Sequence, residues 1–508
     1  MQSTVLFGGP GCGKTAALME VVRQELAAGV PPERIAFTSF TKRAVTEARD
    51  RAVNDCGLTP KQLPLFRTLH SLAYNELGLR KNDVLQMSHW KELGGILGKK
   101  NMQRLDDSDP VPDSRDTLAL AGYLTELSRA RCTTPEEEWH ALDWTEEPAL
   151  SVQQLRHYAR TVAAYKTQRG LVDFTDMLEQ YNAGNGTVIN ADVAIIDEAQ
   201  DLSLLQWRVA QRAFAGVKRI YYAGDDDQCI FHWSGADVNA FLNLPGQRLV
   251  LGHSHRLPRS IHALSRRLAA HIGTRQEKKF TARDEDGSIE RISSLTAIDL
   301  HAMQGSVLLL ARNNYLLTKF IALCREQGVI YQDARGDSSV RTKHITAIKA
   351  WERLRMGRAV TAADARKVYE HLQVGAGFTR GSRAALNALP EEEALTMAEL
   401  RHSFGLCVDA PWHDALTGID LSAREYYLAC RRRGERLLDA PRVRISTIHG
   451  AKGAEADNVV LLTDYSGRTE RASRAAPDAE VRVWYVAATR ARQTLLIVAP
   501  QTQNAFLI

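Results

Sequence analysis

The sequence lacks paired cysteines and long apolar runs. Its seven cysteines include no C-x-x-C pair, which disfavours zinc and iron–sulfur centres and is typical of a reducing compartment. No segment approaches the ~18 consecutive apolar residues of a membrane helix, and the first residues lead directly into a predicted strand. We therefore expect a soluble, cytoplasmic protein that has no membrane partner.

Excess charge of one sign and internal repetition are also scarce. The 65 Lys and Arg residues nearly balance 60 Asp and Glu residues, and the formal net charge of +5 permits a nucleic-acid partner without requiring one. We find no repeat of fixed period and no low-complexity tract. A chain of 508 residues exceeds the size of one hydrophobic core, which predicts about three or four structural units.

A glycine-rich segment, residues 8–15, matches the phosphate-binding pattern G-x-x-x-x-G-K-[ST]. It lies between a predicted strand and a predicted amphipathic helix, so its backbone N–H groups can surround an anion at the helix N-terminus. We expect Lys14 to reach the outer phosphates of a nucleoside triphosphate and Thr15 to bind Mg²⁺. The other expected nucleotide contacts are Gly8, Gly9, Pro10, Gly11, Cys12, Gly13 and Ala16.

Polar residues follow several predicted strands of parallel-sheet type. The apolar run 193–196 is followed by Asp197 and Glu198, whose burial costs free energy unless a cation or a donor meets them. We predict that Asp197 binds magnesium and that Glu198 is a catalytic base, although acidic residues also favour helix N-termini. A second strand end is followed by a polar and aromatic set: Asp225, Asp226, Asp227, Gln228, Phe231 and Trp233.

The alternation of strands and helices is interrupted twice. Residues 75–165 and 341–438 have helical, charged patterns without convincing strands, which predicts two inserted helical subdomains. A short additional strand is predicted at residues 65–70. The remaining chain has an α/β pattern and divides into a first domain and a second domain: residues 1–74 with 166–256, and residues 257–340 with 439–508.

The ordered strand-end motifs resemble those of superfamily 1 helicases, specifically the UvrD, Rep and PcrA group. The resemblance extends over nearly the whole chain and implies an α/β fold of two RecA-like P-loop NTPase domains, each with a helical insertion and with nucleotide in the cleft between them. The similar segments are residues 8–15, 40–41, 68–71, 173–176, 197–200, 224–228, 233–236, 255–256, 447–455 and 485–491.

The resemblance also implies roles for individual residues. Arg256 and Arg490 would join Lys14 and Glu198 in catalysis by meeting the γ-phosphate, and Gln228 would sense that phosphate. Glu455 and His255 would contact the nucleotide, and the choice of base stays open because His255 replaces the tyrosine of the family. Single-stranded DNA would contact Phe40, Thr41, Thr68, His70, Phe231, Trp233, Thr447 and His449; for the aromatic residues, core packing is the alternative.

The activity implied by the resemblance is that of an ATP-dependent DNA helicase or translocase that moves 3′ to 5′ on single-stranded DNA with ATP and Mg²⁺. Duplex junctions and a nuclease, replication or repair protein are the further expected partners. One alternative is an RNA helicase of the same superfamily, because phosphate and stacking contacts distinguish sugars poorly. Another is a nucleotide-switched DNA-binding assembly factor that unwinds nothing.

Overall fold

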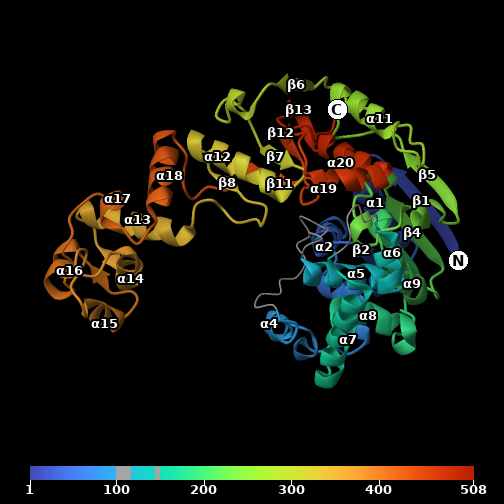
Figure 1. The fold of residues 1–508 in the computed structure, drawn as a ribbon, viewed down its shortest axis with the longest axis horizontal. Helices are drawn as coiled ribbons and strands as arrows, with labels where there is room; N and C mark the ends of the chain where they lie inside the picture. Colours follow the sequence, from blue (N-terminus) through green and yellow to red (C-terminus); the bar gives the residue numbers. More distant parts are fainter. Residues whose placement is uncertain (99–111, 113–115, 143–148) are drawn as a thin grey trace.

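The computed structural model of the chain describes residues 1–98, 112, 116–142 and 149–508. Two separate parallel sheets organise two halves of the molecule (Figure 1). The first sheet has the strand order β2-β3-β4-β1-β5, and all its neighbouring strands are parallel. Its strands are β1 (Gln2–Gly8), β2 (Ile35–Ser39), β3 (Val193–Asp197), β4 (Arg219–Gly224) and β5 (Gln247–Leu251).

Both faces of the first sheet are covered by helices, which explains its continuous apolar runs. In β3, Val193 and Ile195 face one hydrophobic core, whereas Ala194 and Ile196 face the other, as the period of two requires. The first core includes residues of α1 (Lys14–Ala27) and α2 (Lys42–Cys56). The second includes residues of α3 (Leu69–Glu76), α8 (Phe174–Gln180), α9 (Leu204–Ala213) and α10 (Val238–Leu242).

The described part of the segment between α3 and α8 consists of helices joined by loops, and its only β-pairing is an isolated bridge between Val84 and Val172. It contains α4 (Met87–Ile96), α5 (Thr117–Arg131), α6 (Pro135–Ala141) and α7 (Val152–Arg169), which share a hydrophobic core that includes Leu93, Leu124 and Leu155. The rest of the predicted insertion, residues 99–111, 113–115 and 143–148, lies outside the described residues.

The second sheet has the order β6-β13-β12-β7-β11-β8, again with parallel neighbours. Helix α12 (Leu317–Gln327) packs on one face, and α11 (Arg259–Ala269) and α20 (Pro477–Ala488) pack on the other. Helix α19 (Gly467–Ala475) precedes α20. The strands are β6 (Ser288–Ile292), β7 (Val307–Ala311), β8 (Tyr331–Gln332), β11 (Val443–Thr447), β12 (Ala456–Leu462) and β13 (Ala491–Val498).

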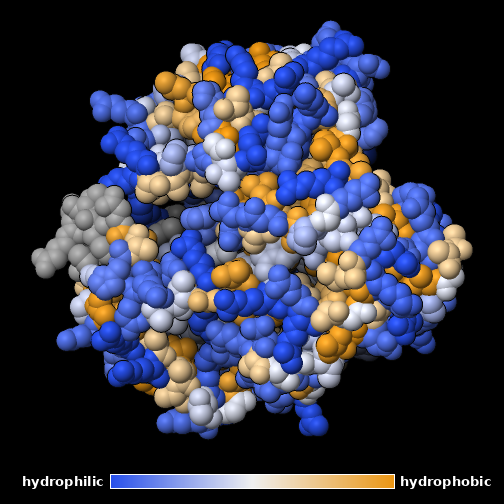
Figure 2. Space-filling view, turned by 90° about the vertical axis from the view of Figure 1, so that its right-hand side faces the viewer, coloured by the Kyte–Doolittle hydropathy of each residue, from blue (hydrophilic) through white to orange (hydrophobic). Residues whose placement is uncertain are grey.

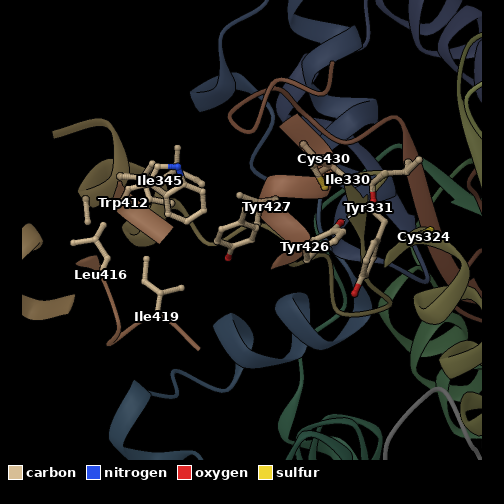
Figure 3. Close-up of a cluster of buried hydrophobic side chains, with 14 of the residues drawn as sticks. Cys324, Ile330, Tyr331, Ile345, Trp412, Leu416, Ile419, Tyr426, Tyr427 and Cys430 are labelled. Atoms are coloured by element: carbon tan, nitrogen blue, oxygen red, sulfur yellow. Dashed lines mark hydrogen bonds between the residues drawn. The ribbon is translucent and has the colours of Figure 1, made fainter. Parts of the chain in front are cut away.

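A lobe of helices projects from the second sheet (Figure 1). It comprises α13 (Thr342–Arg355), α14 (Ala362–His371), α15 (Ser382–Asn387), α16 (Met397–Ser403), α17 (Trp412–Ala415) and α18 (Leu421–Arg432). In Figure 3, Tyr426 and Tyr427 of α18 lie between Trp412 on the lobe side and Tyr331 on the sheet side. One hydrophobic core therefore continues from the sheet into the lobe.

Two predictions about strands are wrong. Residues 65–70 form only a bridge between Phe66 and Phe37, because Thr68 already caps α3 by accepting a hydrogen bond from Ser71 N. The segment 341–438 is not free of strands, since β9 (Val360–Thr361) and β10 (Ala394–Leu395) form a small antiparallel sheet. Two-residue strands are too short to show an alternating pattern.

The surface on the side of β5 carries hydrophobic residues in several small groups among hydrophilic ones (Figure 2). Leu249 and Val250 of this edge strand are among the exposed hydrophobic residues. No helix in the described parts of the chain is both long enough and apolar enough to cross a membrane.

Candidate functional site

The glycine-rich loop connects the end of β1 at Gly8 to the start of α1 at Lys14. Gly11 and Gly13 have φ values of 71° and 77°, a left-handed conformation that favours glycine. A Cβ atom at Gly11 would lie 2.3 Å from Cβ of Arg256, so a larger residue does not fit there. The Lys14 Nζ atom donates to Gly8 O at 2.9 Å. The loop therefore has the conformation and the cation that a phosphate-binding loop requires.

Thr15 and Asp197 meet beside this loop, where the Thr15 Oγ1 atom donates to Asp197 Oδ2 at 3.4 Å. Burial and the neighbouring Glu198 raise the pKa of the Asp197 carboxyl group to about 7. A bound cation would offset both effects and favour the carboxylate. A hydroxyl and a carboxylate are oxygen ligands of the kind that Mg²⁺ prefers, so the predicted pair fits this ion.

Glu198 follows β3 with a strained backbone, because its φ of 51° is left-handed although it is not glycine. Its N–H group donates to Asp197 Oδ1, and its carboxylate accepts a hydrogen bond of 2.6 Å from Gln200 Nε2. Burial alone would raise the pKa of Glu198, but Lys14 and Lys452 outweigh burial and lower it. The carboxylate therefore stays ionised, as a base must be.

Gln228 and Arg490 join the two halves of the molecule. The Nη2 atom of Arg490 donates to Oε1 of Gln228 at 2.7 Å, while Nε2 of Gln228 donates to Asp225 Oδ2 at 2.6 Å. The Arg490 side chain is fully buried. This burial and, to a smaller extent, the positive charge of Arg256 lower the pKa of Arg490 to about 9. An anion that binds near this buried guanidinium group would favour its charged form and raise its pKa again.

The segment after β5 is held against the phosphate loop. Ser254 Oγ donates to Pro10 O at 2.6 Å, and His255 N donates to Gly11 O at 2.9 Å. The Arg256 side chain pairs with Glu455, with Nε 2.5 Å from Oε2. Arg256, His255 and Glu455 therefore lie at the loop, as predicted from their motifs, whereas their contacts with nucleotide stay predictions.

Lys278 is a residue that the sequence did not reveal. Its ammonium group is completely buried and lies 3.2, 2.5 and 2.9 Å from carboxylate oxygens of Asp225, Asp226 and Asp227, respectively. Arg275 adds a bidentate pair with Asp227. Three adjacent carboxylates at the end of a buried strand indicate that a cation must lie near them. The sequence around them does not indicate which residue supplies that cation.

Lys452 also makes contacts that were not predicted for it. Its Nζ atom donates to Asp201 Oδ1 at 2.6 Å and to the Gln228 carbonyl oxygen, both in the first half. The same atom lies 5.0 Å from the centroid of the Phe231 ring, within cation–π range. Lys452 therefore connects Gln228, a residue of the predicted nucleotide site, with one of the predicted DNA-binding aromatic residues.

Four of the predicted DNA-binding residues form a continuous row of rings, which we call the aromatic row. The centroid distances are 5.1 Å for Phe40–Phe231, 6.1 Å for Phe231–Trp233 and 6.5 Å for Trp233–His449. Phe40, Phe231 and Trp233 are partly exposed, whereas His449 is buried. Burial and then Arg312 lower the pKa of His449 well below its usual range, so its ring is neutral. The row crosses from one half of the molecule to the other.

The other predicted DNA contacts have structural partners. Thr41 Oγ1 accepts a hydrogen bond from Ala44 N and caps α2, and Thr68 caps α3. His70 packs edge-on against Phe174, and Thr447 is buried. These four residues stay predictions as DNA contacts. In the described part of the chain, no cluster of three or more His, Cys, Asp or Glu side chains could hold a metal ion.

Comparisons with known proteins agree with this arrangement. Residues 1–247 match the UvrD/REP helicase N-terminal domain, and residues 428–502 match the UvrD-like helicase C-terminal domain.

Three curated relatives are similar to this chain. The putative ATP-dependent DNA helicase YjcD of Bacillus subtilis is 24% identical over 273 residues, covering 48% of this chain and 33% of the relative. The ATP-dependent DNA helicase Rep of Buchnera aphidicola is 21% identical over 340 residues, covering 61% and 47%. The ATP-dependent DNA helicase UvrD2 of Mycobacterium tuberculosis is 25% identical over 548 aligned residues, covering 97% and 76%. The chain thus spans less than half the length of the first two relatives.

Proposed function

The chain belongs to the UvrD/Rep family of helicases, and we propose that it is an ATP-dependent DNA helicase or translocase that moves 3′ to 5′ on single-stranded DNA. The observation that carries this proposal is the hydrogen bond between Arg490 and Gln228, which links the phosphate site of one sheet to the other sheet. An arginine in this position binds differently before and after hydrolysis, so turnover can move the halves relative to each other.

The residues around the loop have complementary roles in phosphoryl transfer to water. Thr15 and Asp197 would hold Mg²⁺, which supplies positive charge to the phosphates when bound. Glu198 accepts a proton from the attacking water, and Lys14 offsets negative charge on the transferred group. Arg490 is hydrogen-bonded to Gln228, so both side chains can contact the transferred phosphoryl group. Arg256, which pairs with Glu455, is a second arginine at the loop.

Coupling to DNA follows from the contacts of Lys452. This side chain holds Asp201 and the Gln228 carbonyl while facing the Phe231 ring. A shift of Gln228 on hydrolysis would therefore reach the aromatic row through short contacts. Bases stack on aromatic rings without regard to sequence, and each stack contributes roughly 1–3 kcal/mol.

ATP hydrolysis with and without single-stranded DNA tests the proposed enzyme. We expect DNA to stimulate turnover and Glu198→Gln to abolish it while the protein still binds ATP. Absence of stimulation, or normal turnover by Glu198→Gln, would contradict the mechanism.

Strand displacement tests the direction and the substrate. We expect unwinding of duplexes with a 3′ DNA tail and none of those with only a 5′ tail. Unwinding confined to the 5′ tail would overturn the polarity. Unwinding of an RNA duplex in place of DNA would identify an RNA helicase, and ATP hydrolysis without any unwinding would indicate a nucleotide-switched assembly factor. Parallel reactions with GTP would define the nucleotide choice.

A further inference from the structure

A hollow of about 480 Å³ lies beside the segment that leads from α11 to β6. It is bordered by the carboxyl-terminal half of α11, by residues 275–281 and by Tyr485 of α20. Sites for small molecules usually have volumes of about 300–1,000 Å³, so the hollow is large enough for such a ligand. None of the residues predicted to bind nucleotide, Mg²⁺ or DNA lines it. The hollow is therefore separate from the sites described above.

Tyr485 supplies an unused hydrogen-bond donor to the hollow. Only 1% of this residue is exposed, and its hydroxyl group has no hydrogen-bond partner among the residues that the structure describes. Burial, and then the nearby Asp225, raise the pKa of Tyr485 well above its usual range, so the hydroxyl group keeps its proton. Buried polar groups in proteins are nearly always hydrogen-bonded. An acceptor on a molecule in the hollow would satisfy this donor.

The rim of the hollow carries two unpaired cations. Arg266 and Lys279 are exposed, and within the described ranges of the chain neither forms an ion pair with a carboxylate. The other two cations of the lining, Arg275 and Lys278, are already held by the buried carboxylates that follow β4. Glu277 is the acidic residue of the lining. The unpaired charge is thus two positive groups against one negative group, which favours an anion.

The lining also offers aromatic and aliphatic surface from Phe280, Ala269 and Ala270. The Phe280 ring lies directly against the phosphate loop, because a Cβ atom at Gly9 would be 2.6 Å from it. Aromatic rings pack favourably with their centroids about 4.5–7 Å apart, so a ring on the ligand can pack on Phe280. A molecule in the hollow would therefore touch a side chain that supports the phosphate loop.

The two sides of the hollow are anchored to different halves of the molecule. The segment 275–281 is held by the first half, because Gln276 N and Lys278 Nζ donate to Asp226 and Thr281 N donates to Gly252 O. Helix α11 and Tyr485 instead belong to the hydrophobic core of the second sheet. A molecule that contacts both sides binds best to the arrangement of the halves seen in this structure.

We propose that this hollow is an effector site for a small aromatic anion. The ring of the ligand packs on Phe280, its charge faces Arg266 and Lys279, and an acceptor atom meets the Tyr485 hydroxyl group. Because the ligand favours one arrangement of the halves, it should slow a turnover that requires them to move. This effect on turnover rests on the proposed function, whereas binding of the ligand does not.

Saturation-transfer NMR with 1-naphthyl phosphate tests the binding, with saturating MgADP present to occupy the phosphate loop. Because 1-naphthol lacks the charge and inorganic phosphate lacks the ring, each should bind about 10-fold more weakly or worse. Thymidine monophosphate and 1-naphthoate then distinguish a nucleotide from an aromatic carboxylic acid as the ligand. If neither displaces 1-naphthyl phosphate, the proposed ligand class is wrong.

Two tryptophan variants locate the bound probe. Ala270→Trp fills the hollow from its rim, whereas Ala263→Trp places the same side chain at an exposed position of α11 that does not line the hollow. We expect Ala270→Trp to weaken binding of 1-naphthyl phosphate at least about 10-fold and Ala263→Trp to leave it unchanged.

Substitutions that remove one polar group each separate the contributions to binding. Arg266→Gln and Lys279→Gln should each weaken binding of 1-naphthyl phosphate about 3-fold and leave that of uncharged 1-naphthol unchanged. Tyr485→Phe should weaken binding about 5-fold, because it removes the donor and keeps the ring.

Steady-state ATP hydrolysis tests the effector role. Saturating 1-naphthyl phosphate should lower kcat about 5-fold in the unaltered protein and in Ala263→Trp, and should not change it in Ala270→Trp. The site is overturned if the probe does not bind, or if it binds Ala270→Trp as tightly as the unaltered protein. Binding without any change in kcat overturns the effector role. Failure of the unaltered protein to hydrolyse ATP would contradict the proposed function instead, and the binding measurements would still decide the site.

Discussion

Arg490 donates its 2.7 Å hydrogen bond to the side-chain oxygen of Gln228 although the two residues are 262 positions apart in the sequence. Gln228→Ala would leave the buried guanidinium group without this acceptor. We expect DNA-stimulated ATP turnover to fall about 10²-fold, because a misplaced catalytic group has an effect of that order.

Steady-state hydrolysis at saturating ATP and DNA measures this loss. The exposed Gln153 on α7 supplies the control, and Gln153→Ala should keep normal turnover. Equal rates for Gln228→Ala and the unaltered protein would show that the contact does not support hydrolysis.

Lys278→Met tests the buried ion cluster. Removing the ammonium group leaves three carboxylates near one another in the interior, so the free energy of unfolding should fall by about 3–5 kcal/mol. The neighbouring Lys279 is exposed, and Lys279→Met should change the free energy of unfolding by only ~0.5 kcal/mol. Urea unfolding of both variants provides the comparison, and similar stabilities would refute the structural importance of the cluster.

Glu198 should reverse the usual order of alanine and glycine. Because its φ is 51°, Glu198→Gly should be about 1 kcal/mol more stable than Glu198→Ala, while both variants lose ATP hydrolysis. At the exposed helical position Glu20, the alanine variant should instead be more stable by about 1 kcal/mol. Thermal unfolding of the four variants measures both differences, and an alanine preference at residue 198 would argue against the strained backbone.

His344 should make the helical lobe sensitive to acid. Burial, and then the neighbouring His371, lower the pKa of His344 to about 4 in the folded protein. Tyr427 contacts its ring at Nδ1, and Arg341 and Lys343 add nearby positive charge.

The unfolded chain gains a proton on His344 near its ordinary pKa of ~6.5, whereas the folded chain does so only near pH 4. The lobe should therefore lose stability as the pH falls from 6.5 towards 4, and keep it above that range. Amide hydrogen exchange of α13 and α14 at pH 7 and pH 5 measures the loss. His344→Gln should show a weaker pH dependence; an unchanged dependence would assign the effect to other groups.

Much of the site could be predicted because its parts are short continuous segments at the ends of buried strands. The loop before Lys14 and the carboxylates after β3 each carry their own pattern, and parallel strands bring such ends to one edge of a sheet. The sheet order then places Asp197 beside Thr15 without any further information.

The remaining contacts depend on pairs that have no local pattern. Lys278 bonds Asp226 from 52 positions away, and Lys452 bonds Asp201 from 251 positions away. Such ion pairs are fixed by the packing of the two halves, which no periodicity in the sequence describes. The edge strands β6 and β8 were not predicted either, because they are short and only partly buried.

The continuous core through Tyr426 and Tyr427 makes the helical lobe a lever arm of the second sheet (Figure 3). Tyr426 also donates a 2.7 Å hydrogen bond to Val329 O, which ties α18 to the chain just before β8. A small rotation of the sheet during ATP turnover would therefore sweep the far end of the lobe through a larger arc. Weakening the packing at this junction should reduce the distance that the far end of the lobe moves in each turnover. It should leave ATP hydrolysis at Glu198 unchanged.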